Sequence, residues 1–342
     1  MKKKLFALFM AVCMVLTAVG CSSQDTEPVQ TDNPGGQNDE NAQNEGEDKA
    51  DYRIVFVPKG VADFWTIVSG GFEQAAKEAD INYEVIYPSQ EEASVQVDTL
   101  YDVINSKPDA IVLSPIDQDA LIAPCQEAKA QGIPVILVDT LISSEDYVTA
   151  FATDNEVAGA KTADTLAELI GKKGKVHIFA GGPSSTSNTA RAKGFTERME
   201  EAYPDVEVLG ILYSESDMSL CTSQVIDIVQ SNPDLKGIFA IDEVRSAGCA
   251  NALVQLDRSD IKLCGFDANN DTVALMEDGI IQSLTVQQPY QMGYLGFGAA
   301  LKAIQGEELE RTTNDTGSTV VLREKMQEEE MQKLLFPLDY IE

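Results

Sequence analysis

Residues 261–289, IKLCGFDANNDTVALMEDGIIQSLTVQQP, decide the fold of this chain. The apolar run IKLCGF has the length and composition of a buried strand, and it ends at Asp267. TVALMED then has the spacing of a helix that stops at Gly279, and IIQSLTV predicts a second strand, which is followed by Gln287. Ligands of open parallel sheets bind outside the carboxyl ends of the strands. Asp267 and Gln287 are therefore candidates for a polar ligand site, and the alternative for Asp267 is that it only caps the next helix.

Outward from this stretch, apolar runs alternate with amphipathic segments in two series, which meet near residue 150 and again after Gln287. This alternation implies βαβ units and parallel sheets, so we predict an α/β fold with two doubly wound, Rossmann-like lobes. The predicted strands cover residues 53–57, 82–87, 109–113, 134–138, 147–152, 175–179, 206–212, 237–241, 261–266, 280–286 and 319–322. The predicted helices cover residues 63–79, 93–106, 119–131, 156–170, 190–202, 219–230, 246–255, 272–278 and 290–305, and GGPSSTSNT at 181–189 predicts a loop.

The N-terminus has the pattern of an export signal. Three lysines precede an apolar segment at 5–19 that is too short to span a membrane comfortably. The sequence AVGCSS follows and resembles the processing site of a bacterial lipoprotein, although Ala18 stands where that pattern usually has Leu. This resemblance implies a signal peptide at 1–20, a lipid on Cys21 and an extracytoplasmic location on the cell membrane. The alternative is an ordinary secretory signal with Cys21 incidental.

The composition limits the possible partners and metal sites. The 342 residues carry a formal net charge of −31, which argues against binding to nucleic acid or to an anionic lipid surface. The lipid is therefore the only membrane contact that we expect. Residues 21–50 are acidic and almost free of large apolar side chains, so they predict a disordered tether. The remaining cysteines lack a CxxC pair, so we expect no metal or cofactor, and the sequence does not settle whether any of them pair: Cys125, Cys221, Cys249 and Cys264.

Seven groups of motifs in the folded body occur in the order seen in the type I periplasmic sugar-binding proteins. They are ADFW with GGFEQAAKEA, DAIVLSPID with AKAQGIPVILVDT, ATDNEVAGAKTADTL, RAKGF, NPDLKGIFAIDE, CGFD and VQQPYQMGYLG. The chain therefore resembles the branch of this family that contains the ribose-binding protein. The resemblance implies two lobes joined by a hinge of three strands, with the ligand in the cleft. By the same resemblance, one lobe comprises residues 51–151 with 288–315, and the other comprises 152–287 with 316–342.

The resemblance also implies residues that bind the ligand. Phe64 and Trp65 match the paired aromatic residues that would cover the apolar face of a sugar, and core packing is the alternative for Trp65. Asp139 matches the aspartate after the fourth strand, where a cap or hinge role is the alternative. Arg191 matches the arginine of R-x-x-G-F, where the alternative is a surface arginine. The two candidates at the carboxyl ends of the opening strands also match ligand positions of the family.

Three departures from the ribose branch affect the expected ligand. Thr140 stands where the branch has Arg, Ile241 where it has Asn, and residues 61–62 where it has asparagines. One strong donor and one amide are therefore missing, which argues against ribose itself. Lys59, Thr140 and Asp242 are placed to compensate, so we include them among the predicted ligand-binding residues.

We weigh four functions. The first is a monomeric binding protein that delivers a small sugar or polyol to the permease and ATPase of an ABC importer. The second is a sensor that presents a sugar or an autoinducer-2-like signal to a membrane receptor, and the same fold serves both. An enzyme is disfavoured because His177, in a buried strand pattern, reads as a core histidine. A repressor with this core would need a DNA-binding domain where the signal and the tether stand.

Overall fold

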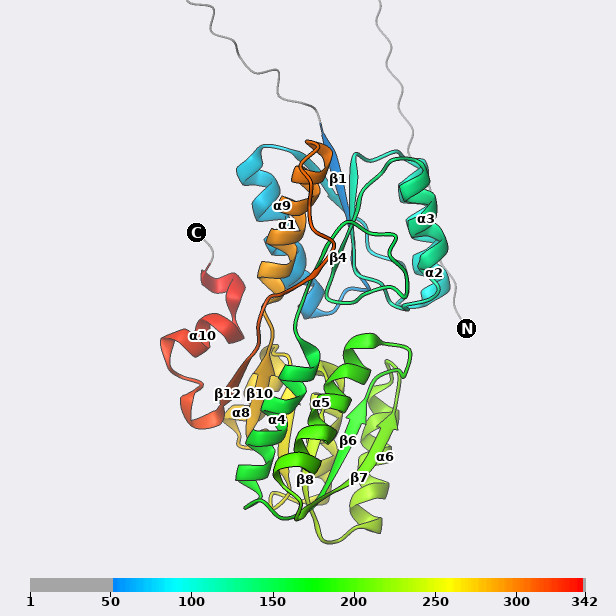
Figure 1. Cartoon of the computed structure of the whole chain (residues 1–342). Coiled ribbons are helices and arrows are strands. Elements are labelled where there is room, and N and C mark those ends of the chain that lie inside the picture. Colours follow the sequence, from blue (N-terminus) through cyan, green and yellow to red (C-terminus); the bar gives the residue numbers. More distant parts are fainter. Residues whose placement is uncertain (1–51, 341–342) are drawn as a thin grey trace, which may run out of the picture. The chain divides into compact units, whose positions relative to one another are not determined.

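The computed structural model describes residues 52–340; the predicted signal peptide, the tether and Cys21 lie outside them. Two six-stranded sheets form the core of this part of the chain (Figure 1). The sheet of the N-terminal lobe has the order β11 (Thr313–Asp315), β5 (Ala150–Ala152), β4 (Val135–Val138), β3 (Ala110–Leu113), β1 (Arg53–Val57) and β2 (Asn82–Val85). The sheet of the C-terminal lobe has the order β12 (Thr319–Leu322), β10 (Ser283–Val286), β9 (Lys262–Phe266), β8 (Leu235–Ala240), β6 (Gly174–Ala180) and β7 (Val206–Tyr213). Neighbouring strands are parallel except β12, which is antiparallel to β10, so the predicted doubly wound α/β fold is confirmed.

Helices cover both faces of the sheet in the N-terminal lobe (Figure 1). Alternate residues of a strand point to opposite faces, and β1 shows this directly. Ile54 and Phe56 join the apolar cluster on one face, whereas Val55 and Val57 join the cluster on the other. The first cluster is covered by α1 (Asp63–Ala79) and α9 (Pro289–Ile304), and the second by α2 (Ala93–Asn105) and α3 (Ile122–Ala130).

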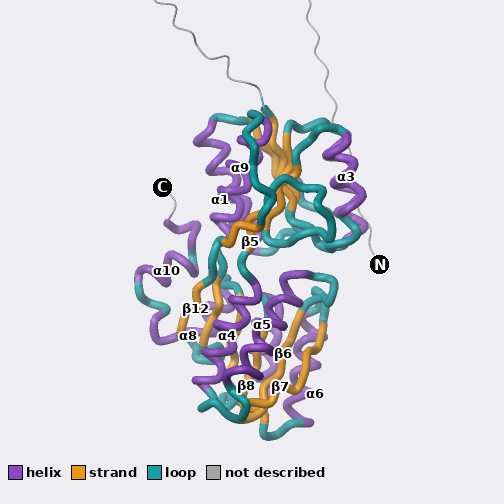
Figure 2. The backbone as a smooth tube through the Cα atoms, in the orientation of Figure 1, coloured by secondary structure: helices purple, strands orange, loops and turns teal. Residues whose placement is uncertain are grey.

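The C-terminal lobe repeats this arrangement (Figure 2). In β6, Ile178 packs under one pair of helices and Phe179 packs under the helices of the opposite face. The first face is covered by α4 (Asn155–Leu169) and α5 (Thr186–Ala202), and the second by α6 (Met218–Ser231), α7 (Glu243–Leu256) and α8 (Asn270–Glu277). The chain then continues through η1 (Arg323–Lys325), α10 (Glu329–Leu335) and η2 (Pro337–Tyr340), and Leu335 is buried in the core of the C-terminal lobe.

Three segments connect the two sheets. They run from β5 to α4, from β10 to α9, and from β11 to β12. Strand β11 is not among the predicted strands; it pairs in parallel with β5, so that Thr313 lies opposite Ala150. Its sequence, TND, is polar and short, so its backbone pairing leaves no periodic pattern to detect. Among residues 52–340, no helix is both long enough and apolar enough to cross a membrane.

Helix α5 begins at Thr186, so the predicted loop at 181–189 is wrong in its second half. The first turn is closed by hydrogen bonds. The backbone N–H of Thr189 donates to the carbonyl oxygen of Ser185, and its Oγ1 donates to that of Thr186 at 3.1 Å. The sequence of this turn, TSNT, therefore has no apolar periodicity to detect. Further along, α5 packs closely against α4, because a Cβ atom added to Gly159 would lie 2.1 Å from the backbone oxygen of Arg191. This close contact fixes the direction from which Arg191 leaves the helix.

The histidine and three cysteines of the C-terminal lobe are buried in its core. His177 is 4% exposed in β6, its Nδ1 lies 2.9 Å from the carbonyl oxygen of Ile178, and burial lowers the pKa of its ring. Cys264 is buried in β9, where burial raises the pKa of the thiol to about 12. Cys221 and Cys249 are also buried, with their Sγ atoms 4.0 Å apart. These findings agree with core roles for His177 and Cys264.

Candidate ligand-binding site

A cavity of about 350 Å³ is lined by loop and helix residues of both lobes, which lie beyond the ends of the strands. Eight of the nine predicted ligand-binding side chains line it, namely Lys59, Phe64, Trp65, Asp139, Arg191, Asp242, Asp267 and Gln287. The ninth, Thr140, is 1% exposed and lies behind this lining. Two of the aspartates occupy equivalent places, because Asp139 follows β4 and Asp267 follows β9, each the fourth strand of its lobe along the chain. Both have a positive φ, of 66° and 61°, a conformation that aspartate tolerates better than most residues.

The first group of polar contacts lies in the N-terminal lobe. Lys59 donates from Nζ to Oδ2 of Asp139 at 2.9 Å and to Oγ1 of Thr140 at 2.5 Å, and Thr140 donates to the same Asp139 oxygen at 2.7 Å. Burial would raise the pKa of the Asp139 carboxyl, but Lys59, Arg191 and these hydrogen bonds hold it below its ordinary value. Asp139 is therefore an ionised acceptor at the wall of the cavity. Thr140 acts on Lys59 and Asp139 rather than on the cavity.

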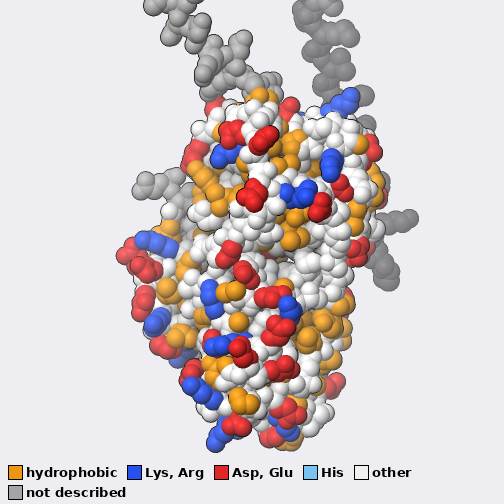
Figure 3. Space-filling view, in the orientation of Figure 1, with side chains coloured by type: hydrophobic (Ala, Val, Ile, Leu, Met, Phe, Trp, Pro, Cys, Tyr) orange, Lys and Arg blue, Asp and Glu red, His pale blue; other side chains and the backbone are white. Residues whose placement is uncertain are grey.

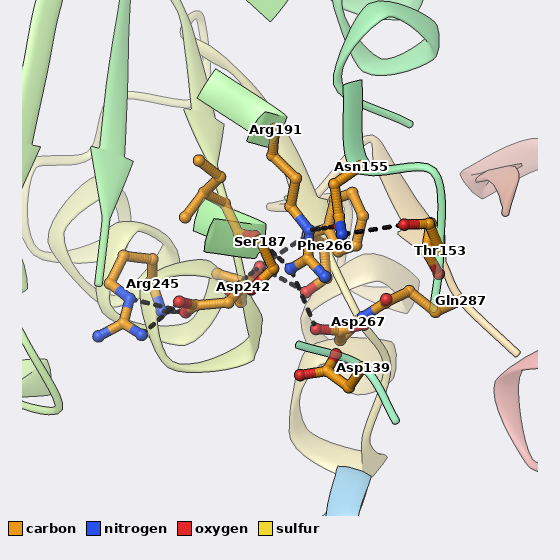
Figure 4. A network of polar contacts seen from close by, with 12 residues as sticks. Asp139, Thr153, Asn155, Ser187, Arg191, Asp242, Arg245, Phe266, Asp267 and Gln287 are labelled. Carbon is orange, nitrogen blue, oxygen red and sulfur yellow. Dashed lines mark hydrogen bonds and ion pairs between the residues drawn. The ribbon is translucent and has the colours of Figure 1, made fainter. Parts of the chain in front are cut away.

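The second group lies in the C-terminal lobe and centres on Arg191 (Figure 4). Arg191 is 3% exposed, so the surface alternative is wrong. Its Nε donates to Oδ1 of Asn155 at 2.7 Å, and NH1 donates to the carbonyl oxygen of Ile241 at 3.0 Å. The guanidinium also lies over the ring of Phe266, 3.8 Å from its centroid, a favourable cation–π geometry. NH1 is 3.8 Å from Oδ2 of Asp267, which completes a loose ion pair.

Asp267 is held by its neighbours but does not cap the following helix. Gln287 donates from Nε2 to Oδ1 of Asp267 at 2.7 Å. The cap of α8 is Asn269, which forms a capping box with Thr272, so the helix-cap alternative for Asp267 is wrong. Burial raises the pKa of the Asp267 carboxyl to about 6, although Arg191 and Gln287 act in the opposite direction. The carboxyl also lies near Asp139 of the other lobe, which adds to the rise (Figure 4).

Asp242 differs from the other aspartates because its oxygens are already occupied. It caps α7 by accepting from the backbone N–H of Arg245 at 3.0 Å. The Arg245 side chain binds the same carboxylate, with Nε 2.6 Å from Oδ1 and NH2 bonded to Oδ2. Asp242 therefore lines the cavity as one half of an ion pair. Arg245 is not among the predicted site residues, although the Asp-x-x-Arg spacing places it beside Asp242 on one side of the first helical turn.

The two aromatic residues pack edge to face, with ring centroids 4.8 Å apart. Trp65 is 6% exposed and belongs to the apolar cluster under α1, and it also lines the cavity. The alternative of core packing is therefore correct, and the side chain has both roles. Nζ of Lys59 lies 5.5 Å from the centroid of the Trp65 ring. The N-terminal lobe thus holds the Trp65 ring in place, and the ring presents a rigid apolar surface to the cavity.

Several lining residues were not predicted. They include Glu91, Asn188, Glu215, Glu243 and Arg245. Three buried acceptor atoms of the lining have no hydrogen-bond partner among the described residues: Oδ1 of Asn188, Oε2 of Glu243 and Oε1 of Gln287. Buried acceptors normally find a donor. The cavity therefore presents acceptors that a ligand can satisfy.

A model of the periplasmic binding protein domain matches residues 54–308. The chain belongs to this family. This periplasmic binding protein is 26% identical to the ribose import binding protein of Bacillus subtilis over 249 residues, which are 73% of this chain and 80% of that protein. It is 24% identical over 259 residues to the xylitol-binding protein of Mycolicibacterium smegmatis, covering 75% of this chain and 73% of the relative.

Solved structures agree with this family. The periplasmic binding protein matches a carbohydrate transporter solute binding protein from Agrobacterium radiobacter, crystallised with D-arabinose, with a TM-score of 0.80 and 29% identity over 84% of this chain and 99% of that one. A solute binding protein from Agrobacterium vitis, bound to α-D-tagatopyranose, matches with a TM-score of 0.80 and 29% identity over 83% and 99% of the two chains. The predicted family, with its ribose-binding branch, is confirmed. A binding protein rather than an enzyme is confirmed with it, through the family and its relatives.

Proposed function

We propose that this protein captures a small sugar or sugar-like polyol in the cavity between its lobes and delivers it to an ABC importer. The observation that carries the proposal is the cavity of about 350 Å³ at the ends of strands of both sheets, with buried Asp139, Arg191, Asp267 and Gln287 in its lining. This volume falls in the range of small-molecule sites. Sugars have many hydroxyl groups, and charged or amide groups bind them with short, strong hydrogen bonds.

The aromatic residues supply the other half of sugar recognition. Phe64 and Trp65 offer an apolar surface for the C–H face of a sugar ring, while the polar groups bind its rim. The relatives support this proposal, since they carry names for ribose, D-apiose and xylitol, and the solved structures hold D-arabinose and D-tagatose.

A thermal-shift screen tests the ligand class. The panel contains pentoses, hexoses, their polyols, amino sugars and the furanose signal autoinducer-2. At least one member should raise Tm, because a ligand that binds only the folded state stabilises it by mass action. No shift with any member at millimolar concentration would contradict the proposal. Ribose should not be the best ligand, because Thr140, at the position of the branch's arginine, is buried against Lys59.

The location and delivery are part of the proposal. A lipid on Cys21 would hold the protein on the outer side of the cell membrane, with residues 22–50 as the tether. Cys21→Ala should release the protein from membranes or leave an unprocessed precursor, and unchanged processing with full membrane retention would contradict the anchor. On the surface, acidic and basic side chains are interspersed over the face shown in Figure 3, which gives an anionic membrane no basic patch on that face to bind.

The sensor alternative shares the cavity and differs in the partner. Deleting the gene and measuring uptake of the radiolabelled ligand separates the two functions. Uptake should fall to background if the protein serves an importer, and it should persist if the protein only presents ligand to a receptor. We expect a monomer, which light scattering coupled to size-exclusion chromatography checks.

A further inference from the structure

The lining of the cavity carries an unbalanced charge. Its basic groups are Lys59, Arg191 and Arg245, and each is already paired with an aspartate of the same lining. Within the described part of the chain, no ion pair joins the three remaining carboxylates to a basic side chain; they are Glu91, Glu215 and Glu243. Six carboxyl groups thus face three cations in this lining.

Glu243 is the carboxylate best placed to act on a ligand. It is the first residue of α7, and its Oε1 accepts from Nδ2 of Asn269 at 2.8 Å. Its Oε2 is buried and has no partner among residues 52–340. Burial, together with the negative charges of Asp267 in its own lobe and Asp63 in the other, raises the pKa of Glu243 to about 7. The potential at this point of the cavity is therefore negative, and it is made by both lobes.

A second, independent observation concerns hydrogen bonding. Gln287 is 2% exposed, and its Nε2 is used by Asp267, so its Oε1 remains free at the cavity. Oδ1 of Asn188 is a further free acceptor of the lining. The basic side chains Lys59, Arg191 and Arg245, by contrast, each donate to groups of the protein. The buried side-chain atoms of the lining that lack a partner among residues 52–340 are all acceptors.

We propose that the ligand carries a protonated amine, as an amino sugar or an amino-substituted polyol, and that Glu243 binds its ammonium group. This inference rests on the proposed function and narrows it. An ammonium has three donors and no acceptor, which suits a lining with free acceptors and excess negative charge. Beside a neutral sugar, Glu243 is ionised only in part at neutral pH, whereas an ammonium pairs with the carboxylate and favours its ionised form. Uronates and sugar phosphates are anions, so the carboxylates of the lining should repel them.

Calorimetry with matched ligands tests this inference on the folded protein. Galactose, galactosamine, N-acetylgalactosamine and galacturonate form one series, and the glucose and arabinose counterparts form two more. In the series that fits the cavity, the free amine should bind at least about tenfold tighter than the neutral sugar and its N-acetyl derivative. The uronate should bind more weakly than either. The preference for the amine should shrink when the salt concentration rises from about 10 mM to 500 mM, because salt screens charge attraction.

Two variants test whether Glu243 is the source of the preference for amines. Glu243→Gln keeps the shape of the side chain and removes its charge, so the affinities for amine and neutral sugar should come within about threefold of each other. Glu200→Gln makes the same change in net charge on an exposed site of α5 and should keep the preference. If Glu243→Gln does not fold, the salt dependence of the parent protein still decides the question.

The outcomes separate this inference from the proposed function. Binding of neutral sugars with equal or weaker binding of the amines would overturn the inference and leave the sugar-binding function intact. No binding of any sugar, amine or polyol would overturn both. Binding of neutral sugars that requires calcium or magnesium would also overturn the inference, because a metal ion would then supply the positive charge.

Discussion

Asp267→Asn should make the ligand-free protein more stable at pH 8 while weakening its binding of ligand. Asp267 is 8% exposed, and burial raises the pKa of its carboxyl from 3.8 to about 6. The folded state therefore holds a proton at pH values at which the unfolded chain has lost it. A rise of about two pKa units corresponds to about 3 kcal/mol of stability that is lost as the carboxyl ionises.

The sign of the pH dependence follows from this rise. Between about pH 4 and pH 6 the folded state binds more protons than the unfolded state, so the free energy of unfolding falls as the pH increases through this window. Below it the carboxyl is neutral in both states, and above it the full cost applies. Asparagine resembles the neutral acid and keeps the oxygen that accepts from Gln287, so the variant avoids the cost.

Urea denaturation at pH 4.5 and pH 8 measures the effect. Asp267→Asn should exceed the parent by about 3 kcal/mol at pH 8 and by much less at pH 4.5. Asp227→Asn, on the exposed side of α6, is the matched control and should change little at either pH. A variant less stable than the parent at pH 8 would contradict this prediction, because Arg191 and Gln287 would then more than compensate the burial of the Asp267 charge.

Three further predictions concern binding and motion. Arg191→Ala should weaken ligand binding by roughly ten- to a hundredfold in calorimetry. Arg191→Lys should not restore it, because a lysine cannot reproduce the bonds to Asn155 and Ile241 together with the stacking on Phe266. Affinities within twofold of the parent would contradict this role of Arg191. Trp65→Ala should lower the stability of the N-terminal lobe by about 3–5 kcal/mol and weaken binding without reordering the preferred sugars; a changed order would show that the ring selects among ligands. Small-angle scattering should show a smaller radius of gyration with saturating ligand, since three segments connect the lobes and the cavity is lined by both; an unchanged radius would indicate a cleft that is already closed.

The sequence predicts the architecture well because burial leaves a periodic pattern. The strands of both sheets are apolar on two faces, as in β1, where residues 54–57 are buried and side chains alternate between two clusters. Elements without such a pattern are missed. Strand β11 is held by backbone pairing with β5, and the first turn of α5 is held by the hydrogen bonds that Thr189 donates to Ser185 and Thr186.

The site is predictable in part for a related reason. Asp139 and Asp267 follow strands of two series, so topology alone brings their side chains toward one cavity. The pairing of charges is not visible in the sequence. Asp242 was predicted to face a ligand, yet Arg245 occupies its oxygens, while Glu243, one residue later, has a free acceptor. Such differences depend on side-chain directions within one helical turn, which composition and spacing do not specify.

Calorimetric titration of Asp267→Ala with the best ligand from the screen tests most directly whether the ligand binds between the lobes. Asp267 joins Arg191 and Gln287 in the wall of the cavity, and a charge-assisted hydrogen bond there contributes about 1.5–3 kcal/mol. We expect the variant to fold and to bind roughly ten- to a hundredfold or more weakly than the parent. An affinity within twofold of the parent would show that the ligand binds elsewhere and would contradict the site proposed between the two lobes.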